Sequence, residues 1–412
     1  MNVFKAIAAA TSLAFCLLSP ARADMVTDWN DIAIRATDMA GLPPPPQTRA
    51  MAMVHAAIYD AVNAVERRHA PYAVDLPAPA GTSAEAAVAA AAHGILTGLF
   101  PLQRASLDGS LNTALSKIAE GSARTEGIAL GKEVATRIFD LRKGDGVGAK
   151  VSYALREGPG AYQVTPPMNA QPVIPQWGGV KPFLLRSAVQ FDVPGPPAPG
   201  SAEFMRDFNE VKSFGGRGST TRTNEQTATA IFWAGSEIPP LNAIARSMAA
   251  ARKNTLIDNA RLFAYLNMAM ADSLIAGFEV KYRFNHWRPV TAIRNAAQLQ
   301  NLALTADAKW EPLLVTPPHP EYPSAHCLAT GAAEVVLRQF FGTDAINTAL
   351  VLPAPLGVER RYTSLAQLVK EMEDARVWGG IHFRTADEHG THLGKRIAEF
   401  AMRQFLRPAA ER

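Results

Sequence analysis

The chain has 412 residues, with 41 Lys and Arg against 37 Asp and Glu, and a hydrophobic fraction of 48%. A net charge of +4 is too small to predict a nucleic acid or an anionic membrane as a partner. The hydrophobic fraction is sufficient for one or two packed domains.

Residues 1–23 have the features of a secretory signal peptide. Lys5 supplies the positive start, residues 7–18 are apolar, and Ala21-Arg22-Ala23 has the small residues of a cleavage site. The apolar stretch is too short to span a bilayer. We therefore expect cleavage after Ala23 and a periplasmic or secreted protein without a membrane anchor. The alternative is an N-terminal helix that joins the core.

Cleavage would remove 23 of the 412 residues, among them Lys5 and Arg22. This leaves 389 residues and lowers the net charge from +4 to +2. Cys327 would then be the one remaining cysteine, so no disulfide within the chain is expected.

Helical patterns fill the N-terminal half, residues 24–150. After four prolines at 43–46, Val54, Ile58 and Val62 recur at four-residue steps, which predicts a helix over 47–66. Thr82 and Glu85 have the spacing of a capping box and predict a helix from there to about residue 100. Two further helices are expected up to about residue 141. No alternating run is long enough to predict a strand.

Residues 151–200 differ in composition, because they hold ten of the chain's 30 prolines. Proline and glycine at this density indicate a connecting segment rather than a helix. Tyr162, Trp177, Phe183 and Phe191 favour a connector that packs on the protein over a disordered linker. Residues 201–412 would then form a C-terminal helical bundle.

The longest predicted helix covers residues 256–287. Leu266, Met270 and Leu274 recur every four residues and mark its buried face. Lys281 follows Leu274 by seven residues, and Arg288 follows Lys281 by seven, so both cations share that face. Buried cations are costly unless an anion meets them. They could instead pair with Asp or Glu, or extend to solvent.

Two later runs could complete an anion site. Pro323-Ser324-Ala325-His326 precedes a predicted helix over 327–341, whose first N–H groups are free to bind an anion. The simpler interpretation of this run is a helix cap followed by a surface histidine. Arg376 and His382 lie six residues apart across two glycines, which suggests a turn that brings them together.

Six of the nine histidines lie between His286 and His392, so the chemistry is expected in the C-terminal half. Arg offers a planar fork for an oxyanion, and His can bind a metal or act as a nucleophile. His389 and His392 have the appearance of a metal pair, but we predict that both lie on the surface of the last helix.

Lys-x6-Arg-Pro from Lys281, Pro-Ser-x-His from Pro323 and Arg-x5-His from Arg376, in this order, resemble the phosphatidic acid phosphatase type 2 superfamily. That superfamily includes bacterial acid phosphatases and vanadium-dependent haloperoxidases. The run from His319 to Ser324 and the run over 55–63 are similar to the haloperoxidase branch. The resemblance is specific over roughly residues 255–400 and diffuse before them.

The resemblance implies an all-α fold of two packed helical bundles, with the active site in the C-terminal bundle. It also implies a vanadate cofactor, and neither haem nor flavin. The residues that would bind the vanadate oxygens are Lys281, Arg288, Ser324, Ala325 through its N–H, and Arg376. His382 would bind vanadium, and His326 would be the acid–base partner of the apical oxygen and of peroxide. Trp287 and His319 would lie around the site or on its halide side.

Two positions depart from the family pattern. Ala325 replaces the usual glycine, so the backbone there must accept a Cβ atom. The acidic residue that orients the second histidine usually lies four residues after it, where this chain has Ala386. Asp387, one residue later, is expected to take that role.

The expected activity is oxidation of a halide by hydrogen peroxide to hypohalite. The alternative is a secreted acid phosphatase, in which His382 attacks phosphorus and His326 protonates the leaving group. A third interpretation is a helical protein that binds an oxyanion without catalysis. The sequence leaves open which halide is oxidised, whether a small organic acceptor takes part, and whether the chain forms a homodimer.

Overall fold

The computed structural model describes residues 24–301, 303–351 and 358–409. Thirteen α-helices fill most of this part of the chain, so the predicted all-α class is confirmed. The predicted signal peptide lies outside the described residues. The α-helices are α1 (Met25–Met39), α2 (Pro44–Glu66), α3 (Ala84–Leu99), α4 (Arg104–Leu115), α5 (Ser122–Leu141), α6 (Ala202–Phe214), α7 (Asn224–Phe232), α8 (Ile238–Arg252), α9 (Leu256–Phe284), α10 (Pro289–Arg294), α11 (Ala325–Phe341), α12 (Leu365–Trp378) and α13 (Arg384–Gln404). Short 3-10 helices cover Pro101–Gln103 (η2), Trp177–Gly179 (η3) and Ala296–Leu299 (η4).

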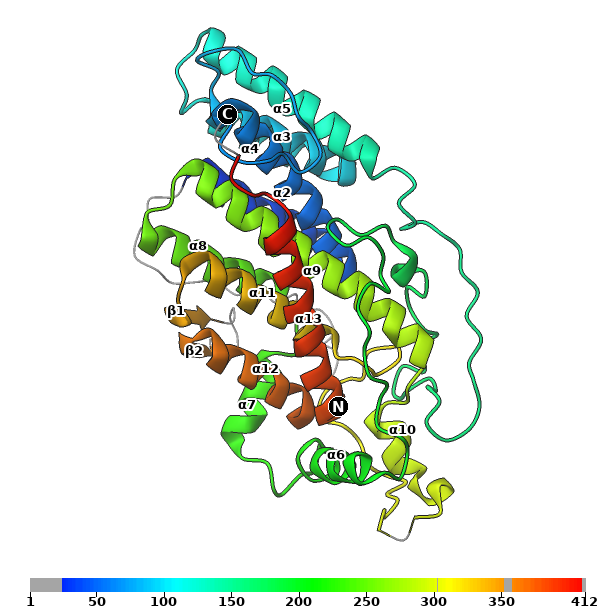
Figure 1. Cartoon of the computed structure of the whole chain (residues 1–412). Helices are drawn as coiled ribbons and strands as arrows, with labels where there is room; N and C mark the ends of the chain where they lie inside the picture. The colour runs from blue at the N-terminus through cyan, green and yellow to red at the C-terminus, as the bar shows by residue number, and fades with distance from the viewer. Residues whose placement is uncertain (1–23, 302, 352–357, 410–412) are drawn as a thin grey trace.

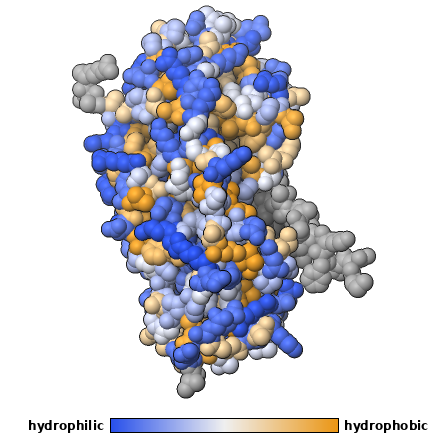
Figure 2. Space-filling model, turned by 90° about the vertical axis from the view of Figure 1, so that its right-hand side faces the viewer, coloured by the Kyte–Doolittle hydropathy of each residue, from blue (hydrophilic) through white to orange (hydrophobic). Residues whose placement is uncertain are grey.

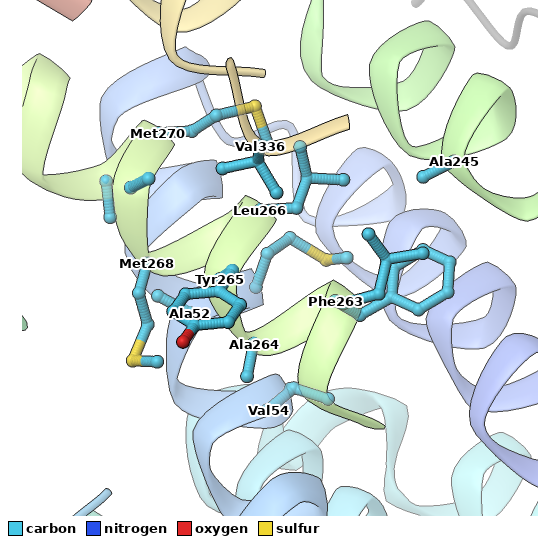
Figure 3. Close-up of a cluster of buried hydrophobic side chains, with 14 of the residues drawn as sticks. Ala52, Val54, Ala245, Phe263, Ala264, Tyr265, Leu266, Met268, Met270 and Val336 are labelled. Carbon is cyan, nitrogen blue, oxygen red and sulfur yellow. The ribbon is translucent and has the colours of Figure 1, made fainter. Parts of the chain in front are cut away.

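Helix α9 is the central element of the molecule. It runs along the length of the molecule with α13, while α3 to α5 lie at one end and α6 and α10 at the other (Figure 1). One hydrophobic core contains side chains from α1 to α5, from α7 to α9 and from α11 to α13. The N-terminal and C-terminal halves of the chain therefore share a continuous core. Figure 3 shows part of it, where Phe263, Leu266 and Met270 of α9 lie among Ala52 and Val54 of α2, Ala245 of α8 and Val336 of α11.

Two short strands depart from the prediction of no strand. β1 (Ala345–Val351) pairs antiparallel with β2 (Glu359–Ser364), in a register that places Thr348 opposite Tyr362. β1 does not alternate regularly between buried and exposed residues, because its register is irregular between residues 345 and 348, and β2 has Tyr362 as its one buried residue. The pair therefore lacks the period-two pattern by which strands are recognised in a sequence.

Two predicted helix ends are displaced. Ser83, not Thr82, caps α3 by accepting from the Ala86 N–H at 3.2 Å, because the Thr82 hydroxyl donates back to Pro79 O at 2.7 Å. Helix α9 ends at Phe284, because Asn285 adopts a left-handed conformation with φ 52°. Arg288 therefore lies outside α9, as the N-cap residue of α10.

The connector over 151–200 contains η3 and otherwise irregular backbone in the described structure. Tyr162, Trp177 and Phe183 are buried in it. Asp272 of α9 holds this segment, since its carboxylate accepts the N–H groups of Phe183, Leu184 and Leu185 at 2.6, 2.7 and 2.8 Å. A single buried carboxylate thus satisfies three consecutive backbone donors and fixes the connector to the central helix.

Asp272→Asn is expected to lower the free energy of unfolding by roughly 1–3 kcal/mol, because an amide leaves a buried N–H group without an acceptor. Urea unfolding measures this change. Asp140→Asn is the matched control, since Asp140 pairs with Lys143 at the surface and its side chain is 53% exposed. The control should change the unfolding free energy by less than about 0.5 kcal/mol. Equal effects of the two substitutions would contradict the role given to Asp272.

Glycines bring α13 into close contact with α11. A Cβ atom on Gly394 would lie 2.1 Å from Leu328 O, and one on Gly390 would lie 2.7 Å from Ser324 O. Larger residues at these positions would separate the two helices. This close approach places the first turn of α13 beside the N-terminus of α11.

The surface shown in Figure 2 intersperses hydrophilic and hydrophobic residues, with the hydrophobic ones in small groups. Among the described helices, none has the length and apolar character needed to cross a bilayer.

Candidate active site

Lys281 lies in the last turn of α9, and its side chain is completely buried. Its Nζ donates to the carbonyl oxygens of Pro320 at 3.1 Å and Glu321 at 2.9 Å, and also to that of Pro323. Burial lowers the pKa of Lys281 well below its ordinary value, and Arg288 lowers it further. Lys281 therefore fixes the segment that leads into α11, and it does so without a carboxylate partner among the described residues.

Arg288 connects all three sequence runs. Its Nε donates to His319 O at 3.0 Å, and one terminal nitrogen donates to both Ile381 O at 2.8 Å and His382 Nε2 at 3.1 Å. A further contact at 3.1 Å reaches His319 Nδ1. Burial lowers the pKa of Arg288 to about 10, while Glu321 acts in the opposite direction.

The two ring nitrogens of His382 have different partners. Nδ1 lies 2.8 Å from Glu321 Oε1, and Nε2 lies 3.1 Å from the Arg288 guanidinium. Because arginine can only donate, Nε2 must be the acceptor and Nδ1 must carry the proton. Burial and the nearby cations lower the pKa of His382 well below its ordinary value, so the ring is neutral. A neutral histidine with a carboxylate behind it is the usual arrangement of a metal ligand.

Arg376 comes from the last turn of α12, and burial lowers its pKa. One terminal nitrogen donates to Trp233 O at 2.5 Å, and its Nε has no hydrogen-bond partner among the described residues. The Trp233 indole in turn donates to Glu371 at 2.9 Å. The segment between α7 and α8 therefore orients this guanidinium.

Ser324 occupies the N-cap position of α11 without a side-chain cap hydrogen bond, and its backbone N–H donates to Ala386 O at 3.0 Å. Its hydroxyl is buried near Asp387 but has no partner with acceptable hydrogen-bond geometry in the described structure. Ala325 is the first residue of α11 and does not have a positive φ. The backbone at Ala325 therefore accommodates a Cβ atom, although the family pattern has glycine at this position.

His326 faces the same α7–α8 segment as Arg376. Its Nε2 lies 2.8 Å from Gly235 O and 3.4 Å from Glu237 Oε2. Burial and the charge of Arg376 lower the pKa of His326 well below its ordinary value. Glu237 is completely buried, neither of its carboxylate oxygens has a hydrogen-bond partner among the described residues, and burial raises its pKa to about 7.

Sequence analysis missed both buried glutamates of the site. Glu321 lies within the run from His319 to Ser324, and Glu237 immediately precedes the Ile238-Pro239-Pro240 start of α8. The position of Glu237 beside prolines that start a helix could have drawn attention to it, but an acidic residue that caps a helix at the surface has the same pattern. Both glutamates reach the site through contacts between residues that are far apart in the sequence. Glu321 and His382 are separated by 61 positions, and Glu237 and His326 by 89.

Asp387 does not orient His382, contrary to the prediction. Its Oδ1 accepts from the Cys327 thiol at 3.4 Å, and its Oδ2 has no partner among the described residues. Asp387 lies in the first turn of α13, from which it reaches Cys327 of α11. The contact with Nδ1 belongs to Glu321.

The other predicted residues lie around this centre. His319 contacts Arg288 through Nδ1 and lies against Phe278, with ring centroids 5.2 Å apart. Trp287 belongs to a second hydrophobic cluster, where it stacks on Phe204 with centroids 6.2 Å apart, and its indole N–H has no partner in the described structure.

The prediction that His389 and His392 are both at the surface is half right. His392 is exposed, but His389 is half-buried, because its Nδ1 lies 2.8 Å from the Tyr322 hydroxyl. No group of three or more His, Cys, Asp or Glu residues in the described parts of the chain has the arrangement of a metal-binding cluster.

The donor set fits a tetrahedral oxyanion. Among the described residues, no ion pair joins Lys281, Arg288 or Arg376 to a carboxylate, although all three are buried. The Ser324 hydroxyl and the Arg376 Nε remain as unused donors. Buried cations and free donors around one histidine nitrogen are the groups that an anion with a histidine-bound centre requires.

Comparisons with known proteins agree with this geometry. Residues 261–410 match the family described as the VCPO second helical-bundle domain. The vanadium chloroperoxidase of Curvularia inaequalis is 28% identical over 401 residues, which cover 76% of this chain and 65% of that relative. The chain thus spans less than two thirds of the relative's length.

Solved structures extend the agreement to the whole fold. The crystal structure of a bacterial vanadium-dependent iodoperoxidase superposes with a TM-score of 0.81 at 26% identity, covering 94% of this chain and 98% of the other. A holo bacterial vanadium-dependent chloroperoxidase superposes with a TM-score of 0.70 at 18% identity, with 94% of each chain covered, and supports the fold alone. The family match, the relative and the iodoperoxidase structure together show that this chain is similar to vanadium haloperoxidases in sequence and in fold.

Proposed function

We propose that the protein is a vanadium-dependent haloperoxidase, which uses hydrogen peroxide to oxidise a halide to hypohalite. The observation that carries this proposal is the protonation and surroundings of the His382 ring. Its Nε2 is unprotonated and lies beside buried cations that no described carboxylate neutralises, while Glu321 holds Nδ1 from behind. The similarity to the iodoperoxidase over nearly the whole of both chains supports the same assignment.

The residues that would hold vanadate are those with free or cationic donors. They are Lys281, Arg288, Ser324, the Ala325 N–H and Arg376 for the oxygens, and His382 Nε2 for the metal. Bound vanadate would supply a Lewis-acidic centre that activates peroxide toward a halide.

His326 would act as the general acid–base group. Its Nε2 lies 2.8 Å from Gly235 O, an acceptor, so Nε2 carries the hydrogen and Nδ1 is left to accept one. The lowered pKa of His326 keeps the ring neutral before peroxide arrives. A neutral ring beside the buried Glu237 can take a proton at Nδ1 and return it during turnover.

The same site suits phosphoester hydrolysis, because phosphate and vanadate are nearly isosteric and the unprotonated His382 Nε2 is also a competent nucleophile. One preparation tests both activities. We expect orthovanadate to be retained stoichiometrically, and bromination of a phenol dye to require both vanadate and peroxide. Turnover of nitrophenyl phosphate by the vanadate-free protein, without any halogenation after loading, would overturn the proposal in favour of the phosphatase.

We also propose that the protein acts outside the cytoplasm, because residues 1–23 have the charge, apolar stretch and cleavage site of a secretory signal. N-terminal sequencing of the protein from the host cell should find Asp24 as the first residue.

A further inference from the structure

Glu321 makes two hydrogen bonds to consecutive residues, His382 and Phe383. Its Oε1 accepts from His382 Nδ1 at 2.8 Å and from the Phe383 backbone N–H at 3.0 Å. The side chain is 1% exposed, so water does not compete for these donors. One carboxylate oxygen thus holds both the imidazole ring and the backbone that follows it.

The backbone of Glu321 is itself fixed from two sides. Its N–H donates to His286 O at 2.9 Å, and its carbonyl accepts from Lys281 Nζ at 2.9 Å. Pro320 and Pro323 further restrict the segment, since proline fixes its own φ angle and limits the residue before it. The carboxylate is therefore held in place before any ligand binds.

Other acidic side chains do not reach the His382 ring. The position four residues after His382 is Ala386, and Asp387 contacts Cys327. Glu237 lies on the far side of the site, 3.4 Å from His326. In the described structure, Glu321 is the acidic residue with a hydrogen bond to His382.

We propose that Glu321 is the positioning residue of His382. It fixes the tautomer with the proton on Nδ1, sets the plane of the ring, and so leaves Nε2 facing Arg288 as the atom that binds the cofactor. The part of this inference that concerns cofactor binding rests on the proposed function, whereas the tautomer can be measured without any cofactor.

Two substitutions separate positioning from charge. In Glu321→Gln, the amide oxygen can still accept from Nδ1 and from Phe383, and the amide nitrogen displaces no existing hydrogen bond because Oε2 has none in the described structure. In Glu321→Ala, the acceptor of both hydrogen bonds is lost. Glu334→Gln is the matched control, since Glu334 is a buried glutamate of α11 that pairs with Arg338 and Lys395 and does not contact the site.

The first measurement is the 15N NMR spectrum of His382 in the protein without vanadate. We expect a proton on Nδ1 in the wild type, in Glu321→Gln and in Glu334→Gln. In Glu321→Ala we expect a mixture of tautomers, because the ring loses the acceptor that orients it and Nε2 is no longer held facing Arg288. The second is orthovanadate affinity by equilibrium dialysis, which should fall 10- to 100-fold in Glu321→Ala and be restored to within about tenfold of wild type in Glu321→Gln.

A wild-type tautomer in Glu321→Ala would overturn the inference, and so would a Glu321→Gln variant as impaired as Glu321→Ala in both measurements. Failure of the wild-type protein to bind orthovanadate would reject the proposed function instead. The NMR comparison would still decide whether Glu321 positions His382.

Discussion

Replacing His382 with alanine is expected to abolish stoichiometric retention of vanadium. The ring provides an unprotonated nitrogen that faces the cations, because Arg288 donates to Nε2 and Glu321 accepts from Nδ1. Protonated Lys281, Arg288 and Arg376 can attract an oxyanion by charge, but as cations they have no lone pair with which to bond a metal centre. Vanadium content measured after gel filtration of the loaded protein gives the result.

His392→Ala is the matched control for this experiment. His392 lies on α13, the helix that begins two residues after His382, and it is exposed to solvent. The control should retain wild-type vanadium content. A His382→Ala variant that still carries one vanadium per chain would remove His382 from its proposed role.

The His382 variant should fold normally, which makes the comparison informative. Removing the ring leaves Glu321 with its bond to the Phe383 N–H, and it leaves Arg288 with its bonds to His319 O and Ile381 O. Both charged groups keep backbone partners, so the cost of burying them changes little. Thermal unfolding close to that of the wild type is expected.

Much of the site could be predicted because its residue types are restricted by chemistry. The seven-residue spacing of Lys281 and Arg288 suggested two inward cations, and both are buried. The reason given was only partly right, since Asn285 ends the helix and Arg288 reaches the site from the N-cap of α10. The burial was predictable from the pattern, and the backbone route was not.

The acidic side of the site could not be predicted, because it depends on tertiary contacts. A family pattern pointed to Asp387, but one residue of displacement on a helix turns a side chain by about 100°. The carboxylate behind His382 instead comes from Glu321, in an irregular segment that Lys281 holds through backbone carbonyls. Glu237 comes from a different segment again, and no periodicity in the sequence connects it to His326.

His326→Ala is expected to keep much of the orthovanadate affinity while halide oxidation falls a hundredfold or more. Three cations, Ser324 and His382 remain to hold the oxyanion, so binding loses only one neutral group. Turnover, in contrast, requires a proton to leave peroxide and later to return, and Nδ1 of His326 is the acceptor available for it. Loss of a general acid–base group of this kind raises the barrier by about 2.7 kcal/mol or more.

Steady-state halogenation and vanadate affinity, measured on one preparation of the variant, separate the two roles of His326. The substitution also removes the contact with Gly235 O and leaves the buried Glu237 without its neighbour. Thermal unfolding must therefore be measured alongside, and His392→Ala again serves as the control for activity. If activity is lost while affinity and stability are retained, His326 acts on protons. If affinity and activity fall in the same proportion, His326 is a binding residue and the proton-transfer role is wrong.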